Sequence, residues 1–487
     1  MVDKQLGGTV PKNRDVDVRT WWLIPVALSC AIAYVMWRPV SHNVILYPVL
    51  LGLAGVAGIV FWRSGRQVDR RLLPPLWFWL AFVAYAIVVA VARDAEYWIR
   101  TLVFFLFWPL VFSVMVLGFR RRVIPILFWC GAIVTIVVSV VFVLGALARS
   151  GALPVDRLPE WIVEPSQLRV SMDSDGIITL SAHSLPPLLW WGPMWLASLF
   201  CRRDNPYLPP TWLRALAAAM ALAGAIIAWR RAIVVVIVLA PALLVIAYAV
   251  LVVRNRVEPP VRLVERPSRY VLGVVGALVL AVGVGFSVQT KAPDLVGRGV
   301  SSIAVTIGIT EPPEPVDLSN LSATPSSETT IEDDRLADAI RQNEWRALTS
   351  VDGAVDLLVG RGIGAAIDRG PADRDMREWQ TELQYHMLFY TTGLVGLALL
   401  AAVGVASLRV VRAAFRADPT LRGILFVSVV GALATLAGNA TNPYMQAPGH
   451  MWPVFLPFMV AAVMFRRQRQ ERETSGPAAS SASPVPS

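Results

Sequence analysis

The 487-residue sequence has few charged residues and few of the residue types that bind metals or form disulfides. Charged residues make up 16% of the chain, whereas a typical soluble domain holds roughly 25%. Three cysteines and four histidines are present. Because Cys30, Cys130 and Cys201 all fall inside or at the edge of apolar segments, a disulfide framework and a cysteine-based metal site are both disfavoured. We expect these cysteines to be small core residues.

Apolar residues dominate instead, at 56% of the chain with a mean hydropathy of +0.57, which indicates an integral membrane protein. A helix crosses the hydrocarbon layer, roughly 30 Å thick, in about 20 residues. The sequence therefore predicts an all-α polytopic membrane protein with about twelve transmembrane helices. They lie near residues 21–37, 44–62, 74–92, 99–118, 123–148, 180–200, 212–229, 232–253, 270–288, 385–407, 422–437 and 451–465.

These spans divide the chain into five parts. Residues 1–20 are polar, and no small-residue cleavage site follows the first apolar run, so we expect an uncleaved signal anchor. Residues 21–288 hold spans one to nine, and 385–465 hold spans ten to twelve. Between them, residues 289–384 form the one large loop. Residues 466–487 end in "SGPAASSASPVPS", which predicts a disordered tail.

The basic residues predict which side of the membrane each loop occupies. Short segments such as "RSGRQVDRR", "FRRR", "RVVRAAFR" and the tail "RRQRQER" alternate with less basic loops, so the positive-inside rule places both termini in the cytoplasm. The net charge of +10 is thus explained by topology and requires no nucleic-acid partner. All four histidines, His42, His183, His386 and His450, then fall on the extracytoplasmic side. Any chemistry is expected on that outer face.

The large loop has two parts of different character. "EPPEPVDLSNLSATPSSETT" is rich in Pro, Ser and Thr and predicts no fixed structure. The following "IEDDRLADAIRQNEWRALTSVDGAVDLLVG" predicts one or two amphipathic helices. Its apolar stripe, which includes Val355 and Leu358, is expected to pack against the membrane domain. Its opposite face carries Arg341, Trp345 and Asp356, and we expect most of its charges to be solvated.

Polar residues also occur where spans meet the outer boundary. Arg230 and Arg231 in "AIIAWRRAIVVVIVL" are costly at that depth unless they snorkel to water or meet an anion. Guanidinium groups suit a diphosphate in particular. The glycines of "GRGIG", residues 360–364, indicate a tight turn or a close backbone approach to a ligand. The Lys and Ser or Thr of a nucleotide-binding P-loop are absent after them.

His386 heads the tenth span, in "TELQYHMLFYTTGLVGLALL". A neutral imidazole can accept a proton at physiological pH, which makes His386 a candidate general base. The alternative is a structural or capping role at the helix start. Glu382, one turn earlier, could orient the ring or be simply exposed.

The order of these features resembles the O-antigen ligase and O-antigen polymerase superfamily of bacterial membrane glycosyltransferases. The resemblance spans residues 165–465 in architecture, but its motifs lie mostly between 330 and 400. The sequence departs from the pattern at Met387, where many relatives have Asn. The matching positions are Arg231, Arg341, Trp345, Gly362, Gly364, His386, Gly393 and Gly396.

The resemblance implies transfer of a glycan from a polyprenyl (undecaprenyl) diphosphate donor to a hydroxyl of a glycan or glycolipid acceptor, outside the cytoplasmic membrane and without metal or other cofactor. His386 would be the base. Arg231 and Arg341, with Arg230 beside them, would hold the diphosphate. Further pocket candidates are Glu382, Trp345, Gly362, Gly364, His183, His450 and Asn439.

Three other functions compete with this ligase-type reaction. A polysaccharide polymerase would use the same donor chemistry and differ only in its acceptor. A lipid flippase or secondary transporter is disfavoured because the chain shows no internal repeat and few charges at mid-membrane depth. A metal-dependent glycosyltransferase would need Asp94 and Glu96, which we expect to pair with Arg93 and Arg100 instead.

Overall fold

The computed structural model describes residues 23–37, 44–64, 68–149, 153–154, 169–172, 178–181, 185–228, 231–255, 345, 347–349, 353–367, 383–440 and 444–475. The predicted ninth span, most of the large loop and residues 476–487 of the predicted C-terminal tail lie outside these ranges. The first part of that predicted disordered tail, residues 466–475, is instead the helical end of α17 (Trp452–Ser475). Within them the chain is helical apart from one antiparallel pair of short strands, in which Arg169 lies opposite Ser181.

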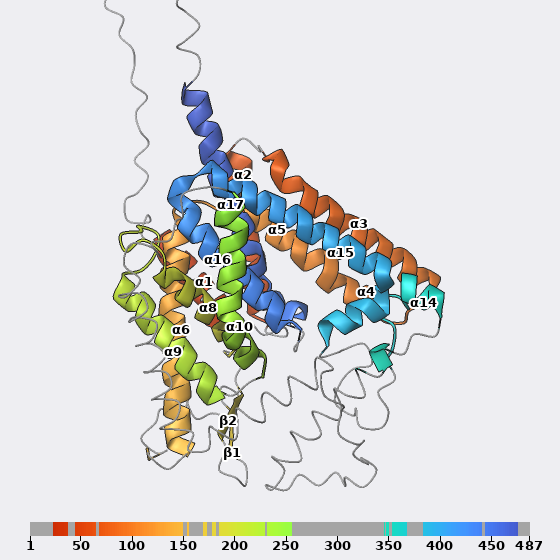
Figure 1. Cartoon of the computed structure of the whole chain (residues 1–487), viewed down its shortest axis with the longest axis horizontal. Coiled ribbons are helices and arrows are strands. Elements are labelled where there is room, and N and C mark those ends of the chain that lie inside the picture. The colour runs from red at the N-terminus through yellow and green to blue at the C-terminus, as the bar shows by residue number, and fades with distance from the viewer. Residues whose placement is uncertain are drawn as a thin grey trace, which may run out of the picture.

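Figure 1 shows the helices side by side in one bundle. In chain order the elements are α1 (Leu23–Trp37), α2 (Leu46–Arg63), η2 (Arg70–Leu72), α3 (Leu73–Ala92), α4 (Trp98–Leu102), η3 (Val103–Phe107), α5 (Trp108–Gly118), α6 (Val123–Arg149), β1 (Arg169–Met172), β2 (Ile178–Ser181), α8 (Pro186–Leu199), α9 (Thr211–Ala228), α10 (Arg231–Tyr248), η5 (Ala249–Val253), α14 (Ala354–Val359), α15 (Gln384–Ala417), η7 (Pro419–Leu421), α16 (Arg422–Gly438), η8 (Tyr444–Gln446), η9 (Pro448–His450) and α17 (Trp452–Ser475).

Eight helical segments of the described chain are long and apolar enough to cross a membrane, which makes this a multi-pass membrane protein. Three further predicted spans coincide with α1, α8 and α17, which are shorter or carry a charged end. The total of twelve stays a prediction because residues 270–288 are not described. The eight segments are Leu46–Arg63, Arg70–Ala92, Trp98–Gly118, Val123–Ala148, Thr211–Ala228, Val235–Val253, Gln384–Ala417 and Pro419–Gly438.

The predicted start of the sixth span is wrong. Residues 178–181 are strand β2, and helix α8 begins only at Pro186. Proline has a fixed φ and no amide hydrogen, so a Pro-Pro pair favours the first turn of a helix and marks its start. The helix that follows has 14 residues and is surrounded by protein: Trp190, Trp191 and Trp195 are all fully buried.

The cysteines follow expectation in part. Cys130 and Cys201 are buried thiols, whereas Cys30 is exposed on α1. The aromatic core around α8 includes the stacked rings of Trp191 and Trp195, whose centroids are 4.9 Å apart. A Cβ at Gly131 of α6 would overlap the Trp191 ring, so this glycine is what lets α6 and α8 approach so closely.

One end of the bundle is held together by arginines, and we call it the basic end. Arg71 of η2 donates to Gln468 of α17 at 2.9 Å, and Arg466 of α17 donates to the carbonyl of Leu117 in α5 at 2.9 Å. Asp69 accepts from Arg71, and this guanidinium holds the pKa of the carboxyl below its usual range. The positive-inside rule predicts that this end faces the cytoplasm.

Labelling from the two sides of the membrane tests this arrangement. Glu96→Cys lies in the exposed turn after α3, and Glu473→Cys lies in the exposed last turns of α17. In a background without Cys30, Cys130 and Cys201, a membrane-impermeant maleimide added to sealed right-side-out vesicles should label Glu96→Cys. It should label Glu473→Cys only after permeabilisation. Equal labelling of both positions from outside would contradict the topology.

Candidate functional site

Helix α15 is broken near its beginning. Gly393 has φ 60° and ψ −167°, values that a helix does not contain and that glycine adopts most readily. Residues 384–392 therefore form a separate helical segment, which we call the head of α15. The break interrupts the hydrogen bonds that would cross it, so the last carbonyl groups of the head need other donors.

The loop before α15 and one tyrosine supply these donors. The amide of Arg361 donates to the carbonyl of Tyr390 at 3.0 Å, and the amide of Gly362 donates to that of Thr391 at 2.9 Å. The hydroxyl of Tyr85 in α3 lies 3.0 Å from the carbonyl oxygen of Thr392. The carbonyls of Tyr390 and Thr391 thus each have an amide donor, and that of Thr392 shares the Tyr85 hydroxyl with the carbonyl of Val359, so the loop is fixed to the head.

The glycines of "GRGIG" make this contact possible. Gly360, Gly362 and Gly364 have φ values of 81°, 93° and 84°. A Cβ at Gly360 would lie 2.5 Å from the carbonyl carbon of Thr391, and one at Gly393 would lie 2.5 Å from that of Leu358. The loop therefore approaches the chain's own backbone closely, whereas the sequence-based expectation was a tight turn or a close approach to a ligand.

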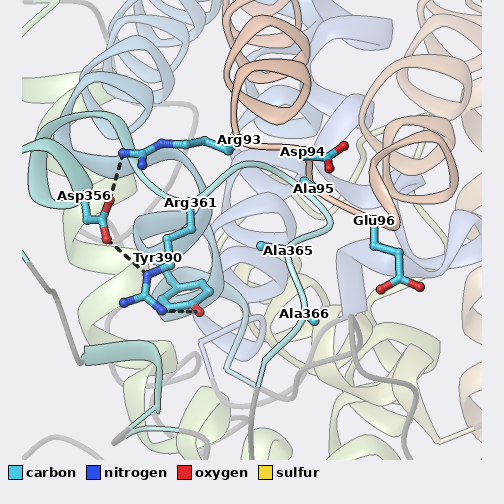
Figure 2. A pocket seen from close by; sticks show the side chains of 9 residues that line it. All are labelled: Arg93, Asp94, Ala95, Glu96, Asp356, Arg361, Ala365, Ala366 and Tyr390. Carbon is cyan, nitrogen blue, oxygen red and sulfur yellow. Dashed lines mark hydrogen bonds and ion pairs between the residues drawn. The ribbon is translucent and has the colours of Figure 1, made fainter.

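A polar pocket of about 410 Å³ opens beside this contact (Figure 2). Its lining residues are Arg93, Asp94, Ala95, Glu96, Asp356, Arg361, Ala365, Ala366 and Tyr390. They come from the turn between α3 and α4, from α14 and the loop after it, and from the head of α15.

A chain of charged contacts forms one wall of the pocket. Asp356 accepts from Arg93 at 2.8 Å and from Arg361 at 3.3 Å. Arg361 continues the chain, because its Nη1 lies 3.1 Å from the hydroxyl of Tyr390 and its guanidinium is 5.1 Å from the ring centre. Asp356 thus holds two cations in place while Tyr390 supports the second.

These contacts correct two expectations. Asp356 is not a solvated charge, and Val355 and Leu358, expected to pack against the membrane domain, are 61% and 49% exposed. Helix α14 has only six residues, between Gly353 and Gly360. The contact at Gly360, and not the apolar stripe, therefore decides which side of α14 faces the rest of the protein.

The expected pairing of Asp94 and Glu96 with neighbouring arginines is also wrong. Arg93 pairs with Asp356, and neither Asp94 nor Glu96 has an ion pair or a side-chain hydrogen bond in the described part of the chain. Asp94 has φ 51°, which turns its side chain away from the helical path of α3. No group of three His, Cys, Asp or Glu residues within the described ranges could hold a metal ion.

His386 is the third residue of the head of α15 and is partly exposed. Its Nδ1 atom is buried and has no hydrogen-bond partner among the described residues. The N-cap of α15 is Leu383, with no side-chain capping bond there, so His386 does not have the capping role considered as its structural alternative. Tyr390 lies four residues later, one helical turn away on the same face.

Residues around the head tie it to the end of α16. Gln384 accepts from Gln446 at 2.7 Å. The Tyr385 hydroxyl donates to the carbonyl of Leu436 at 2.7 Å and also hydrogen-bonds to the side chain of Asn439. Asn439 is buried, and its Oδ1 accepts from the amide of Met445 at 3.0 Å, so it shapes the turn before η8.

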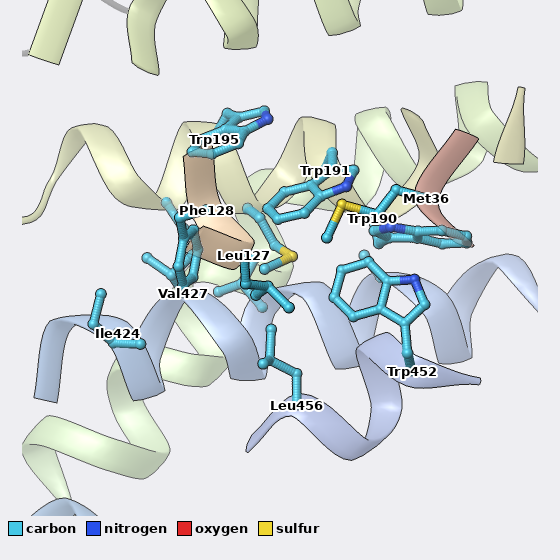
Figure 3. Close-up of a cluster of buried hydrophobic side chains, with 14 of the residues drawn as sticks. Met36, Leu127, Phe128, Trp190, Trp191, Trp195, Ile424, Val427, Trp452 and Leu456 are labelled. Atoms are coloured by element: carbon cyan, nitrogen blue, oxygen red, sulfur yellow. The ribbon is translucent and has the colours of Figure 1, made fainter. Parts of the chain in front are cut away.

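His450 is held in the core. It is 8% exposed and its ring lies 5.7 Å from that of Trp190. Figure 3 shows Trp190 and Trp452 in this layer, and their ring centres are 5.8 Å apart. Neither His450 nor Asn439 lines the pocket of Figure 2, although both were pocket candidates from the sequence.

The structure describes only some of the other predicted site residues. Trp345 is 41% exposed, and Gly362 and Gly364 belong to the loop that contacts the head. Arg231 is the first residue of α10, and only its backbone is described. The remaining four lie outside the described residues: Arg230, Arg341, Glu382 and His183.

Four residues of the pocket were not singled out as site residues from the sequence: Arg93, Asp356, Arg361 and Tyr390. Arg361 lies between two glycines of "GRGIG" in the sequence. This pattern could have indicated a cation whose backbone is held in a fixed turn on each side. No protein-family model matches the chain, and no curated protein matches it.

Gly360→Ala tests whether the loop contact fixes the head of α15. The added methyl group would meet the backbone of Thr391 and require a positive φ of a residue with a Cβ, at a combined cost of about 2–5 kcal/mol. We expect a lower melting temperature in detergent. Gly404→Ala is the matched control. Gly404 lies in the regular part of α15, where an added Cβ would have nothing within 4 Å, so this variant should melt at or above the wild-type temperature. Equal melting of the two variants would contradict the contact.

Proposed function

We propose that this protein is an O-antigen ligase-type membrane glycosyltransferase, which transfers a glycan from a polyprenyl diphosphate donor to an acceptor hydroxyl on the extracytoplasmic face of the cytoplasmic membrane. The observation that carries the proposal is His386. Its imidazole has a buried nitrogen without a partner in the described chain, and it sits one turn from a polar pocket in a multi-pass membrane protein.

The reaction is a substitution at the anomeric carbon. The imidazole of His386 accepts the proton of the acceptor hydroxyl as the hydroxyl oxygen attacks that carbon. The bond between the anomeric carbon and the donor's phosphate oxygen breaks, and its electron pair leaves with polyprenyl diphosphate. The imidazolium then returns its proton to water. No electrons are exchanged with an oxidant or reductant.

Cations must meet the charge that develops on the departing diphosphate. Arg231 opens α10, and the other end of that helix, through η5, reaches the basic end, where Asn255 accepts from Arg412 of α15 at 3.3 Å. The backbone of Arg231 is therefore at the end of the bundle opposite the basic end, as is the head of α15. In the proposed reaction Arg231, Arg230 and Arg341 bind the diphosphate without a metal.

The head of α15 suits this chemistry because of its depth. A donor with its lipid tail in the bilayer presents its diphosphate at the membrane boundary, and the acceptor hydroxyl comes from water. The first turn of a membrane-spanning helix lies at that boundary. A polymerase would carry out the same step with a second lipid-linked glycan as acceptor, so the product distinguishes the two enzymes.

His386→Ala should reduce glycan transfer by about 10²–10⁴-fold, because it removes the general base. The assay uses purified protein in proteoliposomes with an undecaprenyl-diphosphate-linked glycan. The melting temperature should stay near that of the wild type. Tyr385→Phe, which alters the adjacent residue and removes a hydroxyl bonded to the Leu436 carbonyl and to Asn439, leaves the imidazole in place and should keep most of its activity. Full transfer by His386→Ala would rule out the assigned base.

A chelator provides an independent test of the mechanism. If arginines alone meet the diphosphate charge, EDTA at millimolar concentration should leave the transfer rate unchanged. Loss of activity with EDTA and its recovery with added Mg²⁺ or Mn²⁺ would favour the metal-dependent reaction that involves Asp94 and Glu96.

A further inference from the structure

We infer that the pocket lined by Asp94, Glu96, Arg361 and Tyr390 is the acceptor subsite, and that it binds a neutral, hydroxyl-rich sugar. The inference rests on the proposed transfer reaction and adds to it the place and chemical class of the acceptor.

The pocket lies close enough to the proposed base, His386, to hold the acceptor. The acceptor hydroxyl has to lie within hydrogen-bonding distance of His386. Tyr390 lines the pocket and lies four residues after His386, about 6 Å along the helix axis at 1.5 Å per residue. A sugar over Tyr390 therefore has a hydroxyl group one helical turn from the imidazole.

The size of the pocket fits the end of a glycan. Its volume of about 410 Å³ is at the small end of the roughly 300–1,000 Å³ typical of small-molecule sites. Figure 2 shows Ala365 between the Arg361 side and the Asp94 and Glu96 side. Small residues there leave the room between the two polar walls open.

The polar groups suit sugar hydroxyls, which both donate and accept hydrogen bonds. The carboxylates of Asp94 and Glu96 are acceptors with no ion pair or hydrogen bond in the described chain, so they can receive hydroxyl protons. Arg361 is fixed by Asp356 and Tyr390, so little side-chain entropy is lost when a ligand contacts it.

Charge separates this subsite from the donor's diphosphate. The pocket holds two arginines and three carboxylates, and Asp356 already pairs with both arginines. The remaining carboxylates repel an anion, which disfavours a diphosphate and also an acidic sugar. The donor and the acceptor are therefore bound by groups of opposite sign.

The test uses Asp94→Asn and Glu96→Gln, singly and together. Asn tolerates the positive φ of residue 94, so the backbone is kept. Saturation-transfer NMR with methyl glycosides of neutral hexoses as probes should detect binding to the wild type and to His386→Gln. Binding should fall at least tenfold in the double variant and be absent for methyl glucuronide. Glu473→Gln, an exposed carboxylate at the basic end, is the control and should bind like the wild type.

Kinetics separate this inference from the proposed function. In the transfer assay the double variant should raise the acceptor KM at least tenfold and leave the donor KM within twofold of wild type. An unchanged acceptor KM in an active enzyme, or hexoside binding that persists in the double variant, would overturn the acceptor subsite alone. Hexoside binding that depends on Asp94 and Glu96, in a protein that transfers no glycan, would support the sugar subsite and overturn the transferase. Binding of the glucuronide as strong as that of the hexosides would overturn the charge argument.

Discussion

The break in α15 at Gly393 is the constraint on which the site depends. It leaves the carbonyls of residues 390–392 in need of donors, and Arg361, Gly362 and Tyr85 provide them. In a membrane an unsatisfied carbonyl costs several kcal/mol, so the loop cannot leave without a large penalty. The hydrogen bonds that close the break therefore also place Arg361 over Tyr390 and bring Asp356 to Arg93. One backbone irregularity thus builds a pocket from three segments far apart in the sequence.

The two ends of the molecule differ in their chemistry. At the basic end, long side chains such as Arg71 and Arg466 tie helices together. At the other end, polar groups surround open space, and His386 keeps an imidazole nitrogen without a protein partner in the described chain. The charged side chains of the basic end hold helices together, whereas polar groups at the opposite end line an open pocket. The opposite end is therefore the one suited to chemistry.

Sequence patterns predicted the helical class and most span positions, because hydrophobic length is a local signal. They failed where tertiary contacts decided the outcome. The spacing of Val355 and Leu358 suggested a buried stripe, but the contact at Gly360 turned α14 so that Asp356 faced inward. The partner of Arg93 could not be found from its neighbours Asp94 and Glu96, since the true partner is more than 250 residues away in the chain. The role of Tyr390 could not be predicted, because in the sequence it resembles any aromatic residue of a membrane span. Its contact with Arg361 depends on the break in α15.

The central claim is that transfer takes place at the head of α15, between a diphosphate held by arginines and a sugar held by carboxylates. A cryo-electron microscopy structure with a non-transferable polyprenyl phosphonophosphate glycan analogue tests it most directly. The account predicts that the anomeric carbon lies beside His386, with the diphosphate towards the start of α10 and away from Asp94 and Glu96. A diphosphate bound in the pocket with those carboxylates, or a ligand at the basic end, would contradict it.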